Sequence, residues 1–177
     1  MNFARGTSGS SWHVIHTRSR HEKKFRDECE KMSITAYLPL AKSTSIHGGR
    51  IFEFTKPLFP GYLFCYFQKE QRKAILKTRH VANILAVVDQ DGLLRELTEI
   101  EKAIKLKAEL TPYAYLERGT RVKIVDGPFR GIEGIISHRR GKFRLVLNVK
   151  LIEMAAALDV YAHQVEPIDT LPACGGG

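Results

Sequence analysis

The stretch TKPLFPGYLFCYF, residues 55–67, sets two prolines and a glycine directly before a run rich in aromatic side chains. The run after Gly61 alternates between two faces, as the side chains of a β-strand do. One face carries Tyr62, Phe64 and Tyr66, and the other carries Leu63, Cys65 and Phe67. Both faces are apolar, so we expect both to be covered, by helices of the same chain or by an external partner.

The segments around this strand alternate between strand and helix patterns. The expected elements are a strand (12–17), an amphipathic helix (20–32), two strands (34–46 and 50–54) joined by the turn 47–49, a short helix (68–79) and a strand (81–88). A turn follows at 89–92, and Thr98 with Glu101 predicts a capping box that opens a helix over 98–110. The hairpin around 47–49 has few apolar residues to bury, so we expect it to project into solvent. This order predicts an α+β fold with helices against an antiparallel sheet.

The second half of the chain has a different pattern. Residues 111–117 contain Pro112 and show no clear period, so they are the expected linker. Short strands separated by glycine turns come next, with apolar residues at every second position from Phe143 to Leu151. This pattern predicts a small β-barrel. The expected division is a tail (1–11), a first domain (12–110), the linker (111–117), the barrel (118–169) and a second tail (170–177).

Charge and composition narrow the class of partner. The net charge is +9, and residues 1–56 carry ten Lys and Arg against five Asp and Glu. Such an excess suits a polyanion, although basic surfaces also simply keep proteins soluble. No apolar run approaches the roughly 18 residues of a membrane helix, and the first residues lack the apolar core of a signal peptide. We therefore expect a cytoplasmic monomer without a membrane partner.

The residues that usually carry catalysis or bind metals form no recognisable motif. The three cysteines, Cys29, Cys65 and Cys174, are far apart, so we expect buried core thiols and a tail thiol and no metal site. The chain has no glycine-rich phosphate loop, no H-E-x-x-H and no glycine elbow around a nucleophile. We therefore expect no catalytic residue, no cofactor and no enzymatic activity.

Residues 119–136, GTRVKIVDGPFRGIEGII, resemble a KOW motif. Asp126, Gly127 and Pro128 predict a tight turn, and the later glycines permit further reversals of the backbone. The motif residues are Val122, Asp126, Gly127, Pro128, Phe129, Gly131 and Gly134. KOW modules occur in ribosomal proteins as well as in transcription factors, so this motif alone leaves both classes open.

Two upstream segments narrow that choice. WHVIHTRSRHEKKF (12–25) resembles the opening of the N-terminal NGN domain of NusG-like transcription elongation factors, and PLFPGYLFCYF (57–67) resembles that domain's Phe-Pro-Gly-Tyr strand. From about residue 12 to 168 the chain is identified as a member of this family, and KPLFPGYLF with KTRHV favours its specialised RfaH-like paralogues. The resemblance implies an NGN-type antiparallel sheet sandwiched by helices, plus an SH3-like KOW barrel.

The resemblance also implies a function. In this family the NGN domain binds the clamp helices of the β′ subunit of RNA polymerase and suppresses pausing. The barrel recruits partners such as Rho, a ribosomal protein or an antitermination factor. The matching polymerase-binding positions are Phe59, Tyr62, Phe64 and Ile84. The alternative is that these aromatic residues pack beneath the helix expected over 98–110.

Basic positions near the first helix match nucleic-acid contacts of the RfaH-like group. Arg79 matches a position that contacts the non-template DNA strand, and Arg18, Arg20 and Lys24 lie where that group meets exposed bases. Arginine suits this role because it pairs with phosphate and stacks on unpaired bases. The alternative is a solvated helix face with intrahelical ion pairs.

The chain departs from the family pattern at two places. The His-Thr-Thr element of the RfaH-like group is absent at residues 71–73, and VKLIEMAAALDVY (149–161) replaces the Phe-Gly-Arg loop of the housekeeping proteins. These departures favour a paralogue with its own barrel partner. The alternatives are a housekeeping NusG that supports Rho-dependent termination and a KOW-containing RNA- or ribosome-binding protein. Helix formers within 151–159 also leave open a helical state of the barrel.

Overall fold

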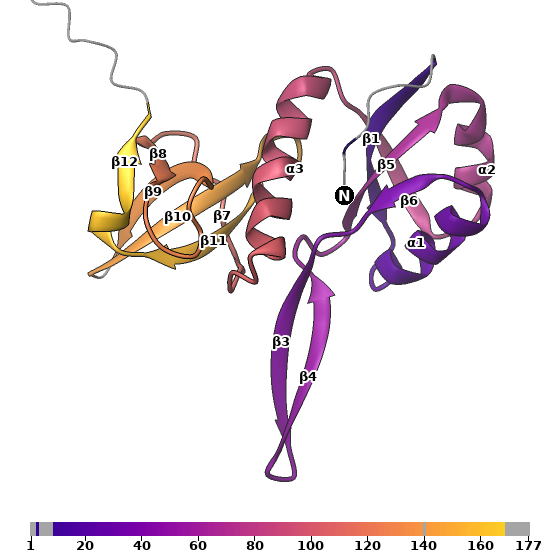
Figure 1. Ribbon diagram of the computed structural model, residues 1–177. Coiled ribbons are helices and arrows are strands. Elements are labelled where there is room, and N and C mark those ends of the chain that lie inside the picture. The colour runs from indigo at the N-terminus through magenta and orange to yellow at the C-terminus, as the bar shows by residue number, and fades with distance from the viewer. Residues whose placement is uncertain (1–2, 4–8, 140, 169–177) are drawn as a thin grey trace, which may run out of the picture. The chain divides into compact units, whose positions relative to one another are not determined.

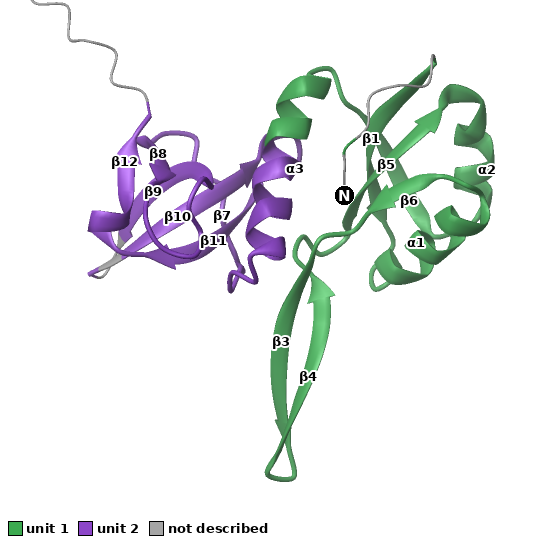
Figure 2. Ribbon diagram, viewed as in Figure 1, with its two compact units in different colours: residues 1–95 green, residues 96–177 purple. Residues whose placement is uncertain are grey.

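The structure is a computed structural model that describes residues 3, 9–139 and 141–168 (Figure 1). The chain divides into two compact units, residues 1–95 and 96–177 (Figure 2). Most of the predicted tails, together with Cys174, lies outside the described residues. The first unit begins with β1 (Ser10–Thr17), α1 (Glu22–Lys31), β2 (Thr35–Tyr37), β3 (Leu40–His47), β4 (Arg50–Pro57), β5 (Tyr62–Gln68), η1 (Lys69–Gln71), α2 (Arg72–Lys77) and β6 (Val81–Ala86).

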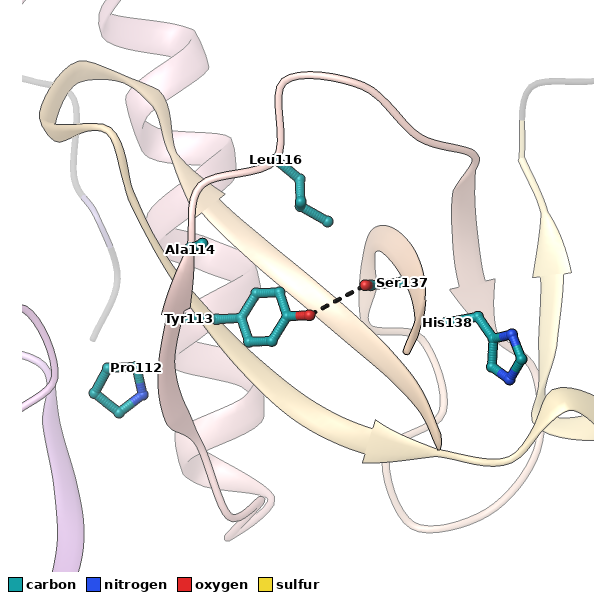
Figure 3. A pocket seen from close by; sticks show the side chains of 6 residues that line it. All are labelled: Pro112, Tyr113, Ala114, Leu116, Ser137 and His138. Atoms are coloured by element: carbon teal, nitrogen blue, oxygen red, sulfur yellow. Dashed lines mark hydrogen bonds between the residues drawn. The ribbon is translucent and has the colours of Figure 1, made fainter. Parts of the chain in front are cut away.

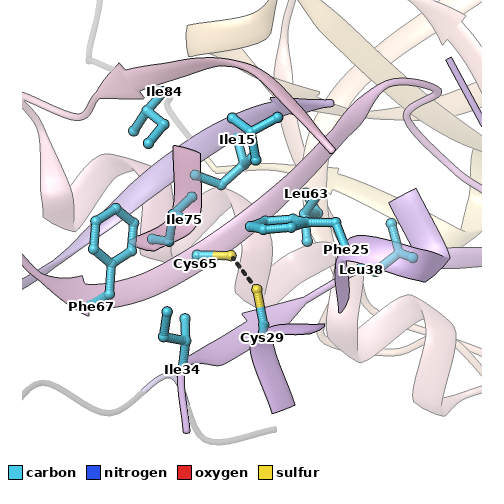
Figure 4. Packing of buried hydrophobic residues seen from close by; sticks show 11 residues of the cluster. Ile15, Phe25, Cys29, Ile34, Leu38, Leu63, Cys65, Phe67, Ile75 and Ile84 are labelled. Carbon is cyan, nitrogen blue, oxygen red and sulfur yellow. Dashed lines mark hydrogen bonds between the residues drawn. The ribbon is translucent and has the colours of Figure 1, made fainter. Parts of the chain in front are cut away.

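A four-stranded antiparallel sheet in the order β2-β5-β1-β6 forms the centre of the first unit. Its core face packs against the two short helices. Phe25 and Cys29 of α1 and Ile75 of α2 are fully buried there with residues of the central strands (Figure 4). The helix period of α1 and the strand period of β5 each direct an apolar row to this layer. The predicted α+β fold with an antiparallel sheet is confirmed.

The two described cysteines face one another across this layer. Cys29 of α1 and Cys65 of β5 are both fully buried, with their Sγ atoms 3.8 Å apart. Burial is the main cause that raises the pKa of the Cys65 thiol well above its ordinary value. A buried thiol with a raised pKa stays protonated and acts as a small apolar group. The prediction that these two residues are core thiols is confirmed.

A long hairpin leaves the sheet between β2 and β5. Strands β3 and β4 pair only with each other, from Leu40 opposite Pro57 to His47 opposite Arg50. Gly48 and Gly49 connect them with φ values of 56° and 75°, the left-handed conformation that a two-residue hairpin loop requires. The predicted hairpin is confirmed, but it carries more exposed apolar side chains than its sequence led us to expect.

The helix after β6, which spans the boundary between the two units, begins earlier than predicted. Helix α3 (Gln90–Lys105) starts directly after Asp89, whose carboxylate Oδ1 accepts a hydrogen bond from the Gly92 N–H at 2.7 Å. Asp89 is therefore the N-terminal cap, a role that aspartate fills well. The predicted turn at 89–92 and the predicted helix start at Thr98 are both wrong, because the true cap lies nine residues upstream.

The second unit contains a six-stranded antiparallel sheet in the order β12-β8-β9-β10-β11-β7. Its strands and short helices are β7 (Thr111–Ala114), β8 (Arg121–Ile124), β9 (Glu133–Arg139), β10 (Lys142–Val149), η2 (Lys150–Ile152), β11 (Met154–Val160), η3 (Ala162–Gln164) and β12 (Val165–Pro167). The β-rich second module expected from the sequence is thus present, and the helix formers of 151–159 lie in η2 and β11.

Residues 111–114 of the segment expected to be a linker, 111–117, form a strand of this sheet. Strand β7 pairs with β11, and the Asn148 side chain holds the next residues by accepting from the Leu116 N–H at 3.2 Å and donating to the Leu116 carbonyl at 2.6 Å. Tyr113 and Leu116 pack against the buried Val146. The second face of β10 is mostly polar, but its Val146 is fully buried, and β7 with the residues after it provides the cover.

The KOW-like residues extend from β8 through the β8–β9 connection into β9. Val122 is buried, and Gly127 and Gly131 have φ values of 84° and 91°, which fits the predicted reversals. Gly134 differs, because it lies within β9, where an added Cβ would come within 2.6 Å of the Val146 carbonyl oxygen. Its role in the structure is close approach of two strands, not a turn.

Candidate functional site

The sheet face opposite α1 and α2 is lined by aromatic rings. Cross-strand pairs on this face are Trp12 with Tyr66, Val14 with Phe64, and His16 with Tyr62. Further rings extend the layer: Phe3 contacts Trp12 and Tyr37 edge-on at 5.5 and 5.0 Å, and Phe59 meets Phe64 at 6.4 Å. Interlocked rings of this kind hold one another in fixed positions.

The four residues predicted to bind polymerase fall into three different environments. Phe59 and Phe64 are fully buried, so their rings act as core within the structure. Tyr62 is partly exposed and stacks on the His16 ring at 4.8 Å. Ile84 pairs with Ile15 in register and belongs to the helix-covered core. The structure therefore brings Phe59, Tyr62 and Phe64 to one face and places Ile84 on the other.

The turn before Tyr62 is held by a buried carboxylate. Glu22, in the first turn of α1 and only 7% exposed, accepts a hydrogen bond from the Gly61 N–H at 2.7 Å. The Gly61 carbonyl accepts from the Thr17 N–H at 2.8 Å, and Gly61 itself has a φ of 85°. The prolines and glycine of the opening stretch thus form a turn that both α1 and β1 anchor. Sequence reasoning missed the roles of Glu22 and His16, because their contacts with Gly61 and Tyr62 join residues far apart in the chain.

Three of the predicted nucleic-acid residues lie on two adjoining turns. The Arg18 N–H donates to the His80 carbonyl at 2.8 Å, and the Nδ1 atoms of His21 and His80 are 2.9 Å apart. Arg20 and Arg79 have φ values of 62° and 61°, a conformation uncommon outside glycine. Arg18, Arg20 and Arg79 are all exposed, so two linked turns present three guanidinium groups. Lys24 is also exposed, on α1.

The second unit offers a cavity of about 500 Å³ beside β7 (Figure 3). The Tyr113 hydroxyl lies 3.2 Å from the Ser137 hydroxyl, and the Arg144 guanidinium lies 5.7 Å from the centre of the Tyr113 ring. The cavity is lined by Pro112, Tyr113, Ala114, Leu116, Ser137 and His138. Nothing in the sequence pattern pointed to it, because most of its lining comes from the segment expected to be a linker and the rest comes from β9.

Two further properties concern the described residues as a set. Within residues 3, 9–139 and 141–168, no cluster of three or more His, Cys, Asp or Glu side chains has a geometry that could hold a metal ion. The helices of the same residues are each too short or too polar to cross a membrane.

Comparison with known proteins identifies the family. A family model described as "Transcription termination factor nusG" matches residues 10–103, more than half of the chain. The chain therefore belongs to the NusG family of transcription factors.

Relatives from several bacteria support the assignment along most of the chain. The transcription termination/antitermination protein NusG of Staphylococcus carnosus is 25% identical, with 89% of this chain and 95% of that protein covered. NusG of Lactococcus lactis is also 25% identical, over 89% and 92% of the two chains. NusG of Borreliella burgdorferi is 23% identical, over 78% and 89%. The similarity to these relatives thus extends beyond the residues 10–103 that the family model matches.

Proposed function

We propose that this chain is an elongation and antitermination factor that binds the β′ clamp helices of RNA polymerase through its first unit. Membership of the NusG family supports a partner in the transcription machinery. The observation that carries the proposal is the Tyr62–His16 stack, a partly exposed aromatic pair beside an anchored turn. Tyrosine anchors of this type dominate many protein interfaces, because they bury large area at little cost in side-chain entropy.

The buried rings have a supporting role in this proposal. Phe59 and Phe64 pack edge-on against each other beneath the surface, where they fix the backbone of β5 and its preceding turn. Tyr62 and His16 then make the direct contact. A factor that binds the active form of polymerase more tightly than the paused form shifts the equilibrium toward elongation, and no chemical step is needed.

The linked turns provide the proposed contact with the non-template DNA strand. Arg18, Arg20 and Arg79 can reach phosphates or stack on unpaired bases, as guanidinium groups do. The His21–His80 contact and the Arg18–His80 backbone hydrogen bond hold the two turns together. The barrel recruits a further protein, and the cavity at Tyr113 is the proposed place for one of its side chains.

A direct test measures binding of the full chain to purified core RNA polymerase. Truncation of a central interface tyrosine costs about 2 kcal/mol or more, close to thirtyfold in affinity. We expect this loss for Tyr62→Ala, with a smaller loss for Tyr62→Phe. The matched control is Tyr161→Ala, because Tyr161 is 70% exposed and lies in the second unit. Equal binding by Tyr62→Ala and the wild-type chain would remove the proposed interface.

The second candidate function is support of Rho-dependent termination. The relatives carry both termination and antitermination in their names, which keeps this candidate open. A termination assay with purified Rho separates the two. Little change in Rho-dependent release on adding the chain favours the antitermination role, and strong stimulation favours the housekeeping role.

A further inference from the structure

The β3–β4 hairpin carries a row of side chains that the first unit leaves uncovered. Phe52 and Phe54 are 51% and 45% exposed, and Ile46 and Ile51 are 73% and 70% exposed. Figure 1 shows the hairpin extending away from the four-stranded sheet. Burial of these side chains at a partner would recover hydrophobic free energy that folding of the chain does not use.

The two faces of the hairpin differ in their chemistry. In RIFEFTK, residues 50–56, every second side chain lies on the same face, so Arg50, Phe52, Phe54 and Lys56 form one row. Phe52 pairs with Ser45 and Phe54 pairs with Ser43 across the hairpin. Because both serines are small, the two rings protrude from the surface of the hairpin. The single carboxylate of the hairpin, Glu53, lies on the opposite face with the isoleucines. The row is therefore aromatic in the middle, basic at both ends and free of acidic residues.

We propose that this row binds single-stranded nucleic acid, with unpaired bases on Phe52 and Phe54 and the phosphates beside Arg50 and Lys56. Side chains two residues apart in a strand are separated by about 7 Å, roughly twice the 3.4 Å rise between nucleotides. Exposed rings on a sheet accept bases of any sequence, because every base presents a flat face. The flanking positive charges match the charge of the backbone.

The base of the hairpin is fixed to the folded unit. The Lys23 Nζ atom of α1 donates to the Thr55 carbonyl oxygen at 2.7 Å and lies 3.4 Å from the Thr55 hydroxyl. Leu58 donates its N–H to the Pro39 carbonyl at 2.9 Å, just beyond the last cross-strand pair. The row is thus presented in a defined direction before any ligand arrives, which reduces the entropic cost of binding. It is separate from the Arg18–Arg79 turns and does not depend on their proposed role.

The experiment measures binding of fluorescent oligonucleotides of about 12 nucleotides, one of uridine and one of deoxythymidine, to the full chain. The test variant is Phe52→Ala with Phe54→Ala. The matched control is Ile46→Ala with Ile51→Ala, which removes exposed apolar groups from the opposite face of the same strands. We expect at least a tenfold loss of affinity for the first pair and less than a twofold change for the control.

Two further variants separate stacking from other causes. Phe52→Leu with Phe54→Leu keeps apolar bulk without a π-face, so we expect it to lose affinity nearly as much as the alanine pair. Arg50→Ala with Lys56→Ala should reduce the slope of log affinity against log salt by about 1.4, the value for two phosphate contacts on a single strand. Circular dichroism checks that each exposed substitution leaves the fold intact.

The outcomes are distinct. Tighter binding of the uridine strand assigns the row to RNA, and tighter binding of the deoxythymidine strand assigns it to unpaired DNA, and either supports the proposal. No binding by the wild-type chain overturns it and points to an apolar protein partner. Full binding by the leucine pair also overturns it, because the bases would then not stack on the rings. The Arg18→Ala, Arg79→Ala variant tests the separate turns. If the two sites act independently, the free energy of binding that it loses should add to the loss caused by Phe52→Ala with Phe54→Ala.

Discussion

The two faces of the four-stranded sheet are built from the same strands and behave differently. The helix-covered face is mainly aliphatic, and Ile15, Leu63 and Cys65 on it are all fully buried. The aromatic face is buried at Trp12, Val14 and Phe64, while Tyr62 and Tyr66 on β5 are partly exposed. One face therefore completes its packing within the unit, and the other presents rings at its edge.

Because of this difference, one face of β5 serves mainly stability and the other serves mainly recognition of a partner. Substitutions on the helix-covered face should mainly lower the stability of the unit, because the side chains there already pack against one another. Substitutions of partly exposed rings on the aromatic face should act mainly on binding, because little of their packing is lost. The following predictions test that division, beginning with the largest effect.

Phe25→Ala should destabilise the first unit by about 3–5 kcal/mol, because it leaves a large cavity between α1 and the sheet. Phe25 is fully buried. Tyr62→Ala, at the edge of the other face, should cost about 1 kcal/mol or less. Urea unfolding of both variants measures the two values. Similar losses would show that the two faces contribute equally to stability and would contradict the division between stability and binding.

Glu22→Ala should cost about 1.5–3 kcal/mol, because it removes a charged acceptor from the Gly61 N–H in a buried setting. The loss should also weaken polymerase binding, since the turn carries Tyr62. The control is Glu30→Ala, an exposed glutamate on the same helix, which should change stability by no more than about 0.5 kcal/mol. If both variants unfold at the same urea concentration, the turn does not need its carboxylate.

Gly61→Ala should cost about 1–2 kcal/mol through backbone strain. The φ of Gly61 is 85°, whereas an added Cβ would lie 3.5 Å from the His16 ring, an ordinary contact. The matched substitution Gly49→Ala, at a φ of 75° in the hairpin loop, should cost a similar amount. Only Gly61→Ala should reduce polymerase binding. Thermal unfolding together with the binding assay distinguishes the two positions.

The smallest predicted effect is a pH dependence on the helix-covered face. Burial, assisted by the charge of Arg72, lowers the pKa of His13 below 6.5, while a hydrogen bond with the Ser11 carbonyl opposes the shift. The folded chain then binds this proton more weakly than the unfolded chain does. The contribution of His13 to stability is therefore complete above pH 6.5 and is lost as the pH falls through the lowered pKa.

His13→Gln should flatten this part of the stability profile between about pH 7.5 and pH 5.5. The ring of His13 stacks on Phe67 at 4.2 Å, so some stability is lost at every pH, and the slope is the informative quantity. His47→Gln, at an exposed position near the hairpin tip, serves as the control and should leave the slope unchanged. Parallel profiles for all three proteins would contradict the prediction.

The sequence predicted elements whose pattern is local, and the errors arose where distant contacts decide. The alternation in residues 62–67 and the helical spacing of Phe25 and Cys29 were sufficient to place β5 and α1. The start of α3 was missed because the Thr98–Glu101 pattern is a valid cap signal that the chain does not use, whereas Asp89 provides the cap. Strand β7 was missed because its partner β11 is about forty residues away.

The candidate site was predictable only in part, for the same reason. Resemblance to the family selected Phe59, Tyr62 and Phe64, and strand alternation placed the last two on one face. It could not tell that Ile84 faces the helices, because that depends on the pairing of β6 with β1. Glu22 lies within the segment 12–25, but its role was missed because its contact with Gly61 joins residues 39 positions apart.

The isolated pairing of β3 with β4 has a consequence for how such a chain can change through evolution. Neither strand is shared with the four-stranded sheet, so lengthening each strand by two residues would move the tip outward by about 7 Å without disturbing the core. Adding one residue to each strand would instead exchange its two faces. Selection can therefore change the length of the β3–β4 hairpin, and the direction in which each of its faces points, independently of the stability of the fold.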